Sequence, residues 1–227
     1  MTKNTISVTI TRFWLLSLMT IILPDLHGQT GTERPLPQFL FPEFTKSIIK
    51  MKDGRRLTAT LNYNMVDEEM VFQQNKTYMV LDKPEETDTV YLQNRQFIPV
   101  DKTFYEVLVK GNISFFIQHK SRYAPVSGTT AYGMKSPTLG PSSVLTMRSG
   151  NQIRSVDLPD NVTVSPATVY WVKTGNEMQK FTTEKQFLKL FPGSEDDLRN
   201  FIKESKIDLK SREDLIKLGN FCNEVIR

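Results

Sequence analysis

The chain of 227 residues is poor in the side chains from which most enzyme sites are built, with one cysteine and two histidines. A single cysteine, Cys222, excludes an internal disulfide and any metal site held by several thiolates. Two histidines leave little for a histidine-based metal centre, and glycine-rich phosphate loops are absent. Cys222 lies in an apolar stripe near the C-terminus, which predicts a buried packing position. The composition therefore predicts no metal and no cofactor.

The sequence also lacks an apolar run of the roughly 20 residues that a membrane-spanning helix needs. Its N-terminal run, residues 13–24, has 12 residues and follows Lys3 and Arg12. This is the pattern of a secretory signal peptide, and Gly28 is a plausible last residue before cleavage. We therefore expect residues 1–28 to be a signal peptide and the protein to be periplasmic, secreted or on the cell surface. An uncleaved N-terminal anchor is the alternative.

The remaining chain divides into three parts by its patterning. Residues 29–45 contain several prolines and predict a tether. Residues 46–181 predict short antiparallel strands; Asp53-Gly54 predicts a two-residue type I′ turn, and period-two alternation follows it from Leu57. Residues 182–227 predict three short helices that begin at Thr183, Ser194 and Ser211, each with an acidic or amide residue three positions on.

The resulting fold class is α+β: an antiparallel β-rich domain, either a sandwich or an open barrel, with a small C-terminal helical subdomain packed on it. No internal repeat and no alternation of strands with helices is present.

One set of short motifs has the order found in serine β-lactamases: Ser47-x-x-Lys50, Ser149-x-Asn151 and Lys173-Thr-Gly175. That chemistry needs the serine and the lysine on one face of a helix, whereas the pattern around Ser47 predicts a strand, in which residues three apart face opposite ways. His119 ends an apolar strand and predicts a hydrogen-bonded histidine at the margin of the core. We therefore predict no catalytic residues. A pair of carboxylates remains an alternative, because their distance cannot be deduced from the sequence.

Two segments are candidates for binding. Residues 124–142 form a long irregular loop, and its centre offers Tyr132, Lys135, Ser136 and Thr138 as candidate binding residues. A stretch rich in cations predicts contact with an anionic surface such as lipid headgroups or acidic glycans. It consists of Lys46, Lys50, Lys52, Arg55 and Arg56. The alternative is that it is a charged, solvent-exposed hairpin, which also protects a strand edge from aggregation.

The segment Asp88-Thr89-Val90 matches a short acceptor pattern for O-glycosylation, with Thr89 as the modified residue. Thr89 is otherwise an ordinary strand residue. Nucleic acid is not an expected partner, because the basic stretch carries no interleaved aromatic residues.

Several segments together resemble an uncharacterised family of exported proteins common in Bacteroidota, over about residues 40–225. The resemblance rests on Leu61–Asn64, Glu69–Phe72, Asp88–Val90, Phe97–Val100, Phe104–Leu108, Tyr132-Gly133, Val169–Trp171 and Gln186–Pro192. It implies export and a single module that includes the C-terminal helices, and it carries over no catalytic residues.

The sequence thus predicts an exported, non-enzymatic interaction module whose partner is an unidentified protein or glycan of the cell envelope. Two alternatives stay open: a carboxylate-based glycan hydrolase of the envelope, and a structural subunit of an envelope complex.

Overall fold

The computed structural model describes residues 36–75, 77–125, 148–153, 156, 158 and 162–226. Residues Arg34–Arg227 form one compact unit. Its strands are β1 (Thr45–Met51), β2 (Arg56–Asn64), β3 (Glu69–Gln74), β4 (Thr77–Val80), β5 (Thr87–Leu92), β6 (Arg95–Val100), β7 (Thr103–Val109), β8 (Ile113–Gln118), β9 (Ser121–Pro125), β10 (Arg148–Ser149), β11 (Gln152–Ile153), β12 (Val162–Pro166), β13 (Val169–Thr174) and β14 (Glu177–Phe181). The helices are the 3₁₀ turn η1 (Pro84–Glu86) and α1 (Glu184–Leu188), α2 (Glu195–Glu204) and α3 (Arg212–Val225).

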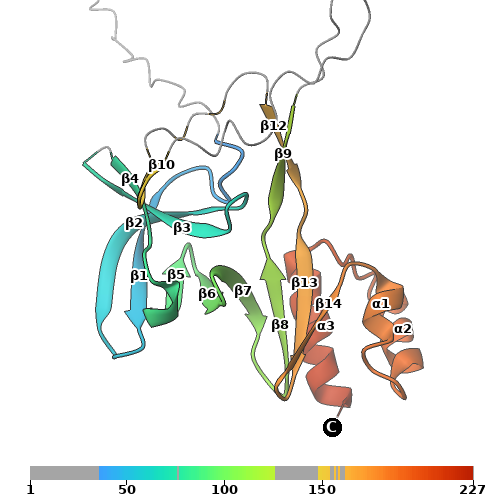
Figure 1. The fold of residues 1–227 in the computed structure, drawn as a ribbon. Helices are drawn as coiled ribbons and strands as arrows, with labels where there is room; N and C mark the ends of the chain where they lie inside the picture. Colours follow the sequence, from blue (N-terminus) through green and yellow to red (C-terminus); the bar gives the residue numbers. More distant parts are fainter. Residues whose placement is uncertain are drawn as a thin grey trace, which may run out of the picture. The chain divides into compact units, whose positions relative to one another are not determined.

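Twelve strands form one antiparallel sheet in the order β10-β11-β4-β3-β2-β1-β5-β6-β7-β8-β13-β14, and β9 pairs with β12 in a separate ribbon. The predicted α+β class with an antiparallel, β-rich domain and C-terminal helices is confirmed. Among the described strands the sheet is open, because β10 and β14 each have a neighbour on one side only. Figure 1 shows the strands of the first half curling on one side and the three helices lying against the last strands.

The curled half of the sheet encloses the first of two large cores. β3 approaches β7 across the curl, and the Tyr63 hydroxyl donates to the carbonyl oxygen of Phe104 at 3.1 Å. Side chains from β1, β2, β3, β5, β6 and β7 fill this core: Ile49, Met51, Leu61, Tyr63, Met70, Val90, Leu92, Phe97 and Phe104. The inward face of β2 is the one that the alternation predicted, with Leu61 and Tyr63 fully buried.

Part of the predicted tether closes this core. Phe39 and Phe41 are 5% and 6% exposed, and the Leu40 amide donates to the Tyr63 carbonyl oxygen. The side chain of Asn62 holds the segment in place, since its amide nitrogen donates to the Phe41 carbonyl oxygen at 2.8 Å. Residues 36–44 are therefore a packed part of the fold.

The second core lies between the last strands and the helices. α3 approaches β7 and β8 closely at Gly219, where a Cβ atom would lie 2.9 Å from Phe115 Cδ2 and 2.9 Å from Val109 Cγ2. The Asn223 side chain fastens the same helix to the start of β8 by accepting from the Ile113 amide and donating to its carbonyl oxygen. Cys222 is fully buried in this core, as its apolar surroundings predicted.

The local signals at the helix starts are confirmed at two of three positions. The hydroxyls of Thr183 and Ser211 accept from the backbone amides of Gln186 and Asp214, each at 3.3 Å. Ser194 precedes α2 but makes no such side-chain bond, so the capping prediction is wrong there. Within the described part of the chain, none of the helices combines the length and the apolar character that crossing a bilayer takes.

Candidate functional site

The two predicted binding segments have different outcomes. Tyr132, Lys135, Ser136 and Thr138 lie outside the described residues. The basic stretch is described completely and forms the β1–β2 hairpin with its turn.

The hairpin turn differs from the expected one. Only Gly54 has a positive φ, +88°, whereas a type I′ turn needs positive φ at both central residues. The loop is instead Lys52-Asp53-Gly54, in which the Met51 amide bonds to the Arg55 carbonyl and the Gly54 amide to the Met51 carbonyl. A carboxylate oxygen of Asp53 also accepts from the Arg55 amide at 3.0 Å, which favours this three-residue form.

The position of the hairpin in the sheet bears on whether its cations protect a strand edge. β1 pairs with β2 and β5, and β2 pairs with β1 and β3, so both strands are internal to the sheet. An internal strand has no free backbone edge to protect. Edge protection is therefore excluded, whereas a charged, solvent-exposed hairpin stays the alternative to a binding surface. Lys46, Lys50 and Arg56 project from a face of the sheet.

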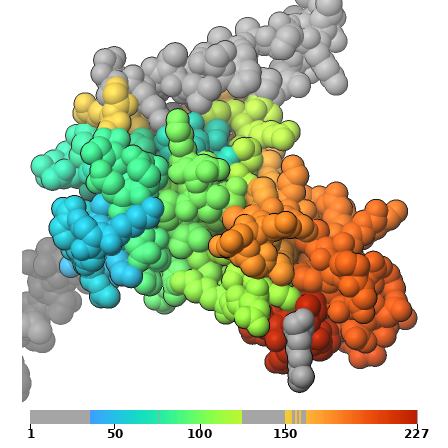
Figure 2. Space-filling model, turned by 60° about the horizontal axis from the view of Figure 1, so that its bottom comes forward, coloured from blue at the N-terminus to red at the C-terminus, as the bar shows by residue number. Residues whose placement is uncertain are grey.

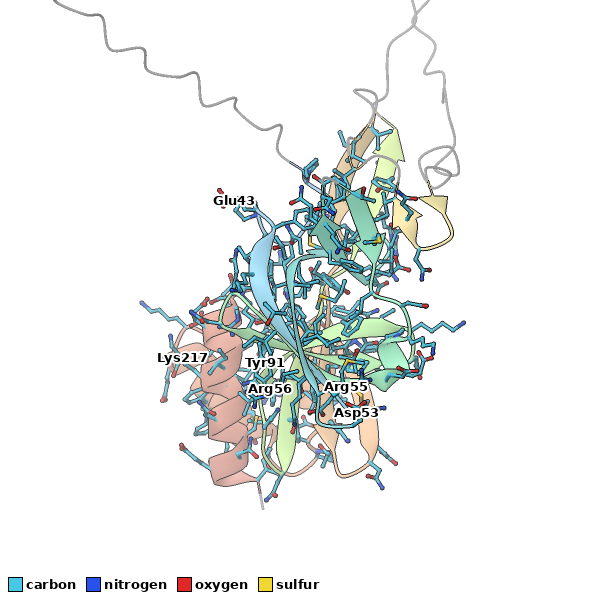
Figure 3. All side chains as sticks on the ribbon, turned by 90° about the vertical axis from the view of Figure 1, so that its left-hand side faces the viewer. Glu43, Asp53, Arg55, Arg56, Tyr91 and Lys217 are labelled. Carbon is cyan, nitrogen blue, oxygen red and sulfur yellow. The ribbon has the colours of Figure 1, made fainter. Side chains whose placement is uncertain are left out.

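We call the outward side of β2, β1 and β5 the basic face. It consists of Lys46, Ile48, Lys50, Arg56, Thr58 and Tyr91. These residues share one side because directly paired residues of antiparallel strands point the same way. Figure 3 labels Arg56 and Tyr91 on it, and Asp53 and Arg55 at the turn.

The basic face exposes apolar as well as charged groups. Ile48 is 41% exposed and its cross-strand partner Tyr91 is 38% exposed. Leu57 is also exposed but pairs with the buried Ile49, so it points to the other side of the sheet. In Figure 2 the blue surface of the hairpin lies apart from the orange and red surface of the helical region.

Positive charge dominates the hairpin. Among the described residues, two of its five cations form ion pairs at 2.6 Å: Lys50 with Asp88 and Arg55 with Asp53. The hydrogen bond and charge of Asp88 raise the pKa of Lys50, which keeps this amine charged at neutral pH. Five cations against two carboxylates leave a surplus of three positive charges, which favours an anionic partner.

Thr89 lies in β5 opposite Lys50 and is 4% exposed. A glycan is bulky and needs a surface position. The burial of Thr89 therefore argues against O-glycosylation of the folded chain at this residue.

A buried charged cluster, which the sequence analysis missed, lies between the two cores. Glu106 of β7 is fully buried, and its carboxylate lies 2.7 Å from His119 Nε2, 2.5 Å from Arg212 Nε and 3.4 Å from Arg95 Nη1. We call these four residues the Glu106 cluster. His119, predicted at the core margin with a hydrogen-bond partner, is 9% exposed and has that partner in Glu106.

The Glu106 cluster fixes a negative charge. Burial by itself raises the pKa of Glu106, but the hydrogen bonds from His119 and Arg212, with the charge of Arg95, lower it below its ordinary value. Because an ionised carboxylate only accepts hydrogen bonds, His119 donates to it through Nε2. A carboxylate held ionised by three donors is suited to joining the sheet to α3 and poorly suited to donating a proton.

We expect this carboxylate to make the folded state sensitive to acid. Because the pKa of Glu106 is lowered in the folded chain, the unfolded chain binds more protons than the folded chain below the ordinary Glu value of 4.5. The stabilisation of the folded state by this carboxylate is therefore present above pH 4.5 and is lost as the pH falls further. The free energy of unfolding of Glu106→Gln should therefore be far below wild type at pH 7, with the difference shrinking toward pH 3. Urea titrations across this range would measure it, and a pH-independent difference would contradict it.

An acidic corner, Asp67-Glu68-Glu69, lies at the β2–β3 turn, and its central residue is buried. Glu68 is 5% exposed and accepts from the side chains of Gln118 and Lys120. Its φ of +58° at the β2–β3 turn directs the side chain over the sheet toward β8.

A cleft of about 260 Å³ lies where the η1 region meets β3 and the start of β7. Glu69, Asp82 and Glu85 contribute carboxylates, Lys83 and Lys102 contribute amines, and Phe104 contributes apolar surface. Carboxylates from separate segments thus line one hollow, as the carboxylate alternative requires. A second described pocket, between α1 and α2, is lined by the carboxylates of Glu184 and Glu195. Among the described residues, no group of three or more His, Cys, Asp or Glu side chains is arranged to hold a metal ion.

The serine motif has no catalytic geometry. Ser47 lies in β1, is 2% exposed and donates to the carbonyl oxygen of Thr45 at 2.8 Å. Lys50 instead bonds to Asp88 on the outward face. The pair lies on opposite sides of one strand, as the period of a strand requires.

No protein-family model matches the chain, and neither a curated protein nor a solved structure shows significant similarity to it. Membership of the exported Bacteroidota family therefore stays a prediction, and function must be argued from the basic face, the Glu106 cluster and the cleft.

Proposed function

We propose that the chain is an exported, non-enzymatic binding module that holds an acidic component of the cell envelope on its basic face. The supporting observation is the central position of the basic hairpin. Three of its five cations lie on internal strands, where no edge needs protection. The exposed Ile48 of β1 and Tyr91 of the neighbouring β5 lie on the same face. An exposed mixture of charge and apolar surface on a rigid sheet is typical of an interaction site.

The proposal predicts that removing three charges from the basic face weakens binding to envelope material. The variant Lys46→Gln/Lys50→Gln/Arg56→Gln should lose at least tenfold in apparent affinity, because the attraction between opposite charges at an exposed surface is lost. Co-sedimentation of the protein with washed envelope fragments measures this, and wild-type binding should weaken as salt rises.

The control variant also loses three positive charges, at positions outside the basic face. Lys180→Gln/Lys203→Gln/Lys210→Gln replaces three exposed lysines of β14, α2 and the α2–α3 connection. It should bind like wild type. Equal loss in both variants would show a nonspecific effect of net charge and would count against the basic face.

The cleft keeps glycan hydrolysis as the second candidate, since carboxylates from separate segments line it beside Phe104. The two candidate functions differ in whether the bound polysaccharide is cleaved. Release of new reducing ends from an envelope polysaccharide, abolished by Glu85→Gln, would support hydrolysis, whereas binding without release supports the module.

A further inference from the structure

We infer that the acidic component is a linear acidic polysaccharide that lies across β2, β1 and β5, with Tyr91 as the surface on which one sugar ring stacks. This inference rests on the proposed function and names its ligand.

The first argument is the arrangement of uncharged groups. Cross-strand pairing places Thr58, Ile48, Tyr91 and Gln96 in one row over β2, β1, β5 and β6. Four adjacent strands span about 14 Å from the first to the last. The row combines an aromatic ring with a hydroxyl and an amide, which can contact the apolar face of a sugar ring and bond to its hydroxyl groups.

The second argument is the position of the cations on both sides of that row. Lys46 and Lys50 flank Ile48 along β1, and Arg56 lies opposite Lys50 on β2. Four residues of a strand separate the two lysines by about 13 Å. Charges on both sides of a polar and aromatic row match a polymer that lies along the row and carries carboxylates on both of its edges.

The third argument separates a polysaccharide from a bilayer. Binding at a membrane interface scales with the apolar area that enters it, in addition to charge. The basic face offers two apolar side chains, Ile48 and Tyr91, each about two-fifths exposed and set in the face of a sheet. That is little area to insert, while one accessible ring is enough for stacking.

The test measures the binding of three probes to the full chain: alginate oligosaccharides, neutral dextran oligosaccharides, and vesicles of phosphatidylglycerol in phosphatidylcholine. Calorimetry or affinity electrophoresis should show salt-sensitive binding to alginate, none to dextran and weaker binding to vesicles. Tyr91→Ala should weaken alginate binding about tenfold, while Tyr91→Phe, which keeps the ring, stays within about twofold. Circular dichroism establishes that each variant is folded.

The outcomes separate the inference from the proposed function. Binding to vesicles but not to alginate would overturn the inference that the ligand is a polysaccharide. It would leave the proposal that the chain binds an acidic component of the envelope. Binding to alginate that is lost in the triple charge variant but unaffected by Tyr91→Ala would overturn the stacking role of Tyr91. Binding to neither anionic probe would overturn both the inference and the proposed function.

Discussion

Replacing Glu106 with alanine should lower the free energy of unfolding by about 3 kcal/mol, the lower end of the cost of removing one partner from a buried ion pair. The carboxylate is the shared counter-charge of Arg95 and Arg212, it accepts a hydrogen bond from His119, and it is fully buried. Its loss leaves positive groups at the junction of the two cores. The cost stays at the lower end because the Arg95 and Arg212 side chains are 31% and 27% exposed and can regain water.

The position of Arg212 adds to this effect. It is the first residue of α3, where the helix dipole disfavours a positive charge. Glu106 offsets that cost and holds the start of the helix against β7. A double-mutant cycle between Glu106→Ala and Arg212→Ala should therefore give a coupling of more than 1 kcal/mol.

Glu213 is the matched control, because it also approaches Arg212, at 3.8 Å, but is 74% exposed. Glu213→Ala should change the free energy of unfolding by less than about 0.5 kcal/mol, as for other exposed pairs. Urea denaturation at pH 7 gives all of these values. A loss below 1 kcal/mol for Glu106→Ala would show that the cluster does not hold α3.

The elements that the sequence predicted well depend on neighbours along the chain. The inward side of β2 followed from alternation, and the caps at Thr183 and Ser211 followed from a partner three residues on. Where local signals compete, prediction failed. Asp53-Gly54 fits a two-residue turn, yet the bond from the Arg55 amide to Asp53 favours the three-residue loop.

The features that were missed depend on residues far apart in the chain. Glu106 was treated as one position in a strand, although its partners are 11, 13 and 106 residues away. A signal was present: Glu106 shares its side of β7 with the buried Phe104, and an inward carboxylate needs a buried partner. The choice among possible partners required the fold.

The basic face also combines features that depend on chain neighbours with features that depend on residues far apart in the chain. The sequence identified the cations but could not place the hairpin inside the sheet. The second neighbour of β1 is β5, which is separated from β1 in the chain by β2, β3 and β4. Tyr91 belongs to that returning strand, and so it was not linked to Lys50 and Arg56. The long-range pairing turns a basic segment into a face with an aromatic centre.

Phe187 should be the costliest apolar side chain to truncate on the helical side, with Phe187→Ala lowering the free energy of unfolding by about 3–5 kcal/mol. Its ring is fully buried and lies 5.0, 5.3 and 5.9 Å from the rings of Phe181, Phe191 and Phe115. It belongs to α1, which has five residues and is too short to form without tertiary contacts.

The control for size is Phe201→Ala, which also removes a helical ring. Phe201 stacks on Phe221 at 3.9 Å, but both rings are partly exposed, so the loss should be smaller. Two probes follow unfolding in urea: far-ultraviolet circular dichroism, and the fluorescence of Trp171 in β13, with Trp14 changed to Phe in every variant.

The two signals should change together in Phe187→Ala as in the parent chain, because α1 and α3 share one core with β8, β13 and β14. The mutation then moves the whole transition to lower urea instead of releasing the helices first. Helical signal lost ahead of the Trp171 signal would show that the helices are a separate folding unit. In that case the Glu106–Arg212 contact would connect two independent domains, and the cost of Glu106→Ala would appear only in the helical transition.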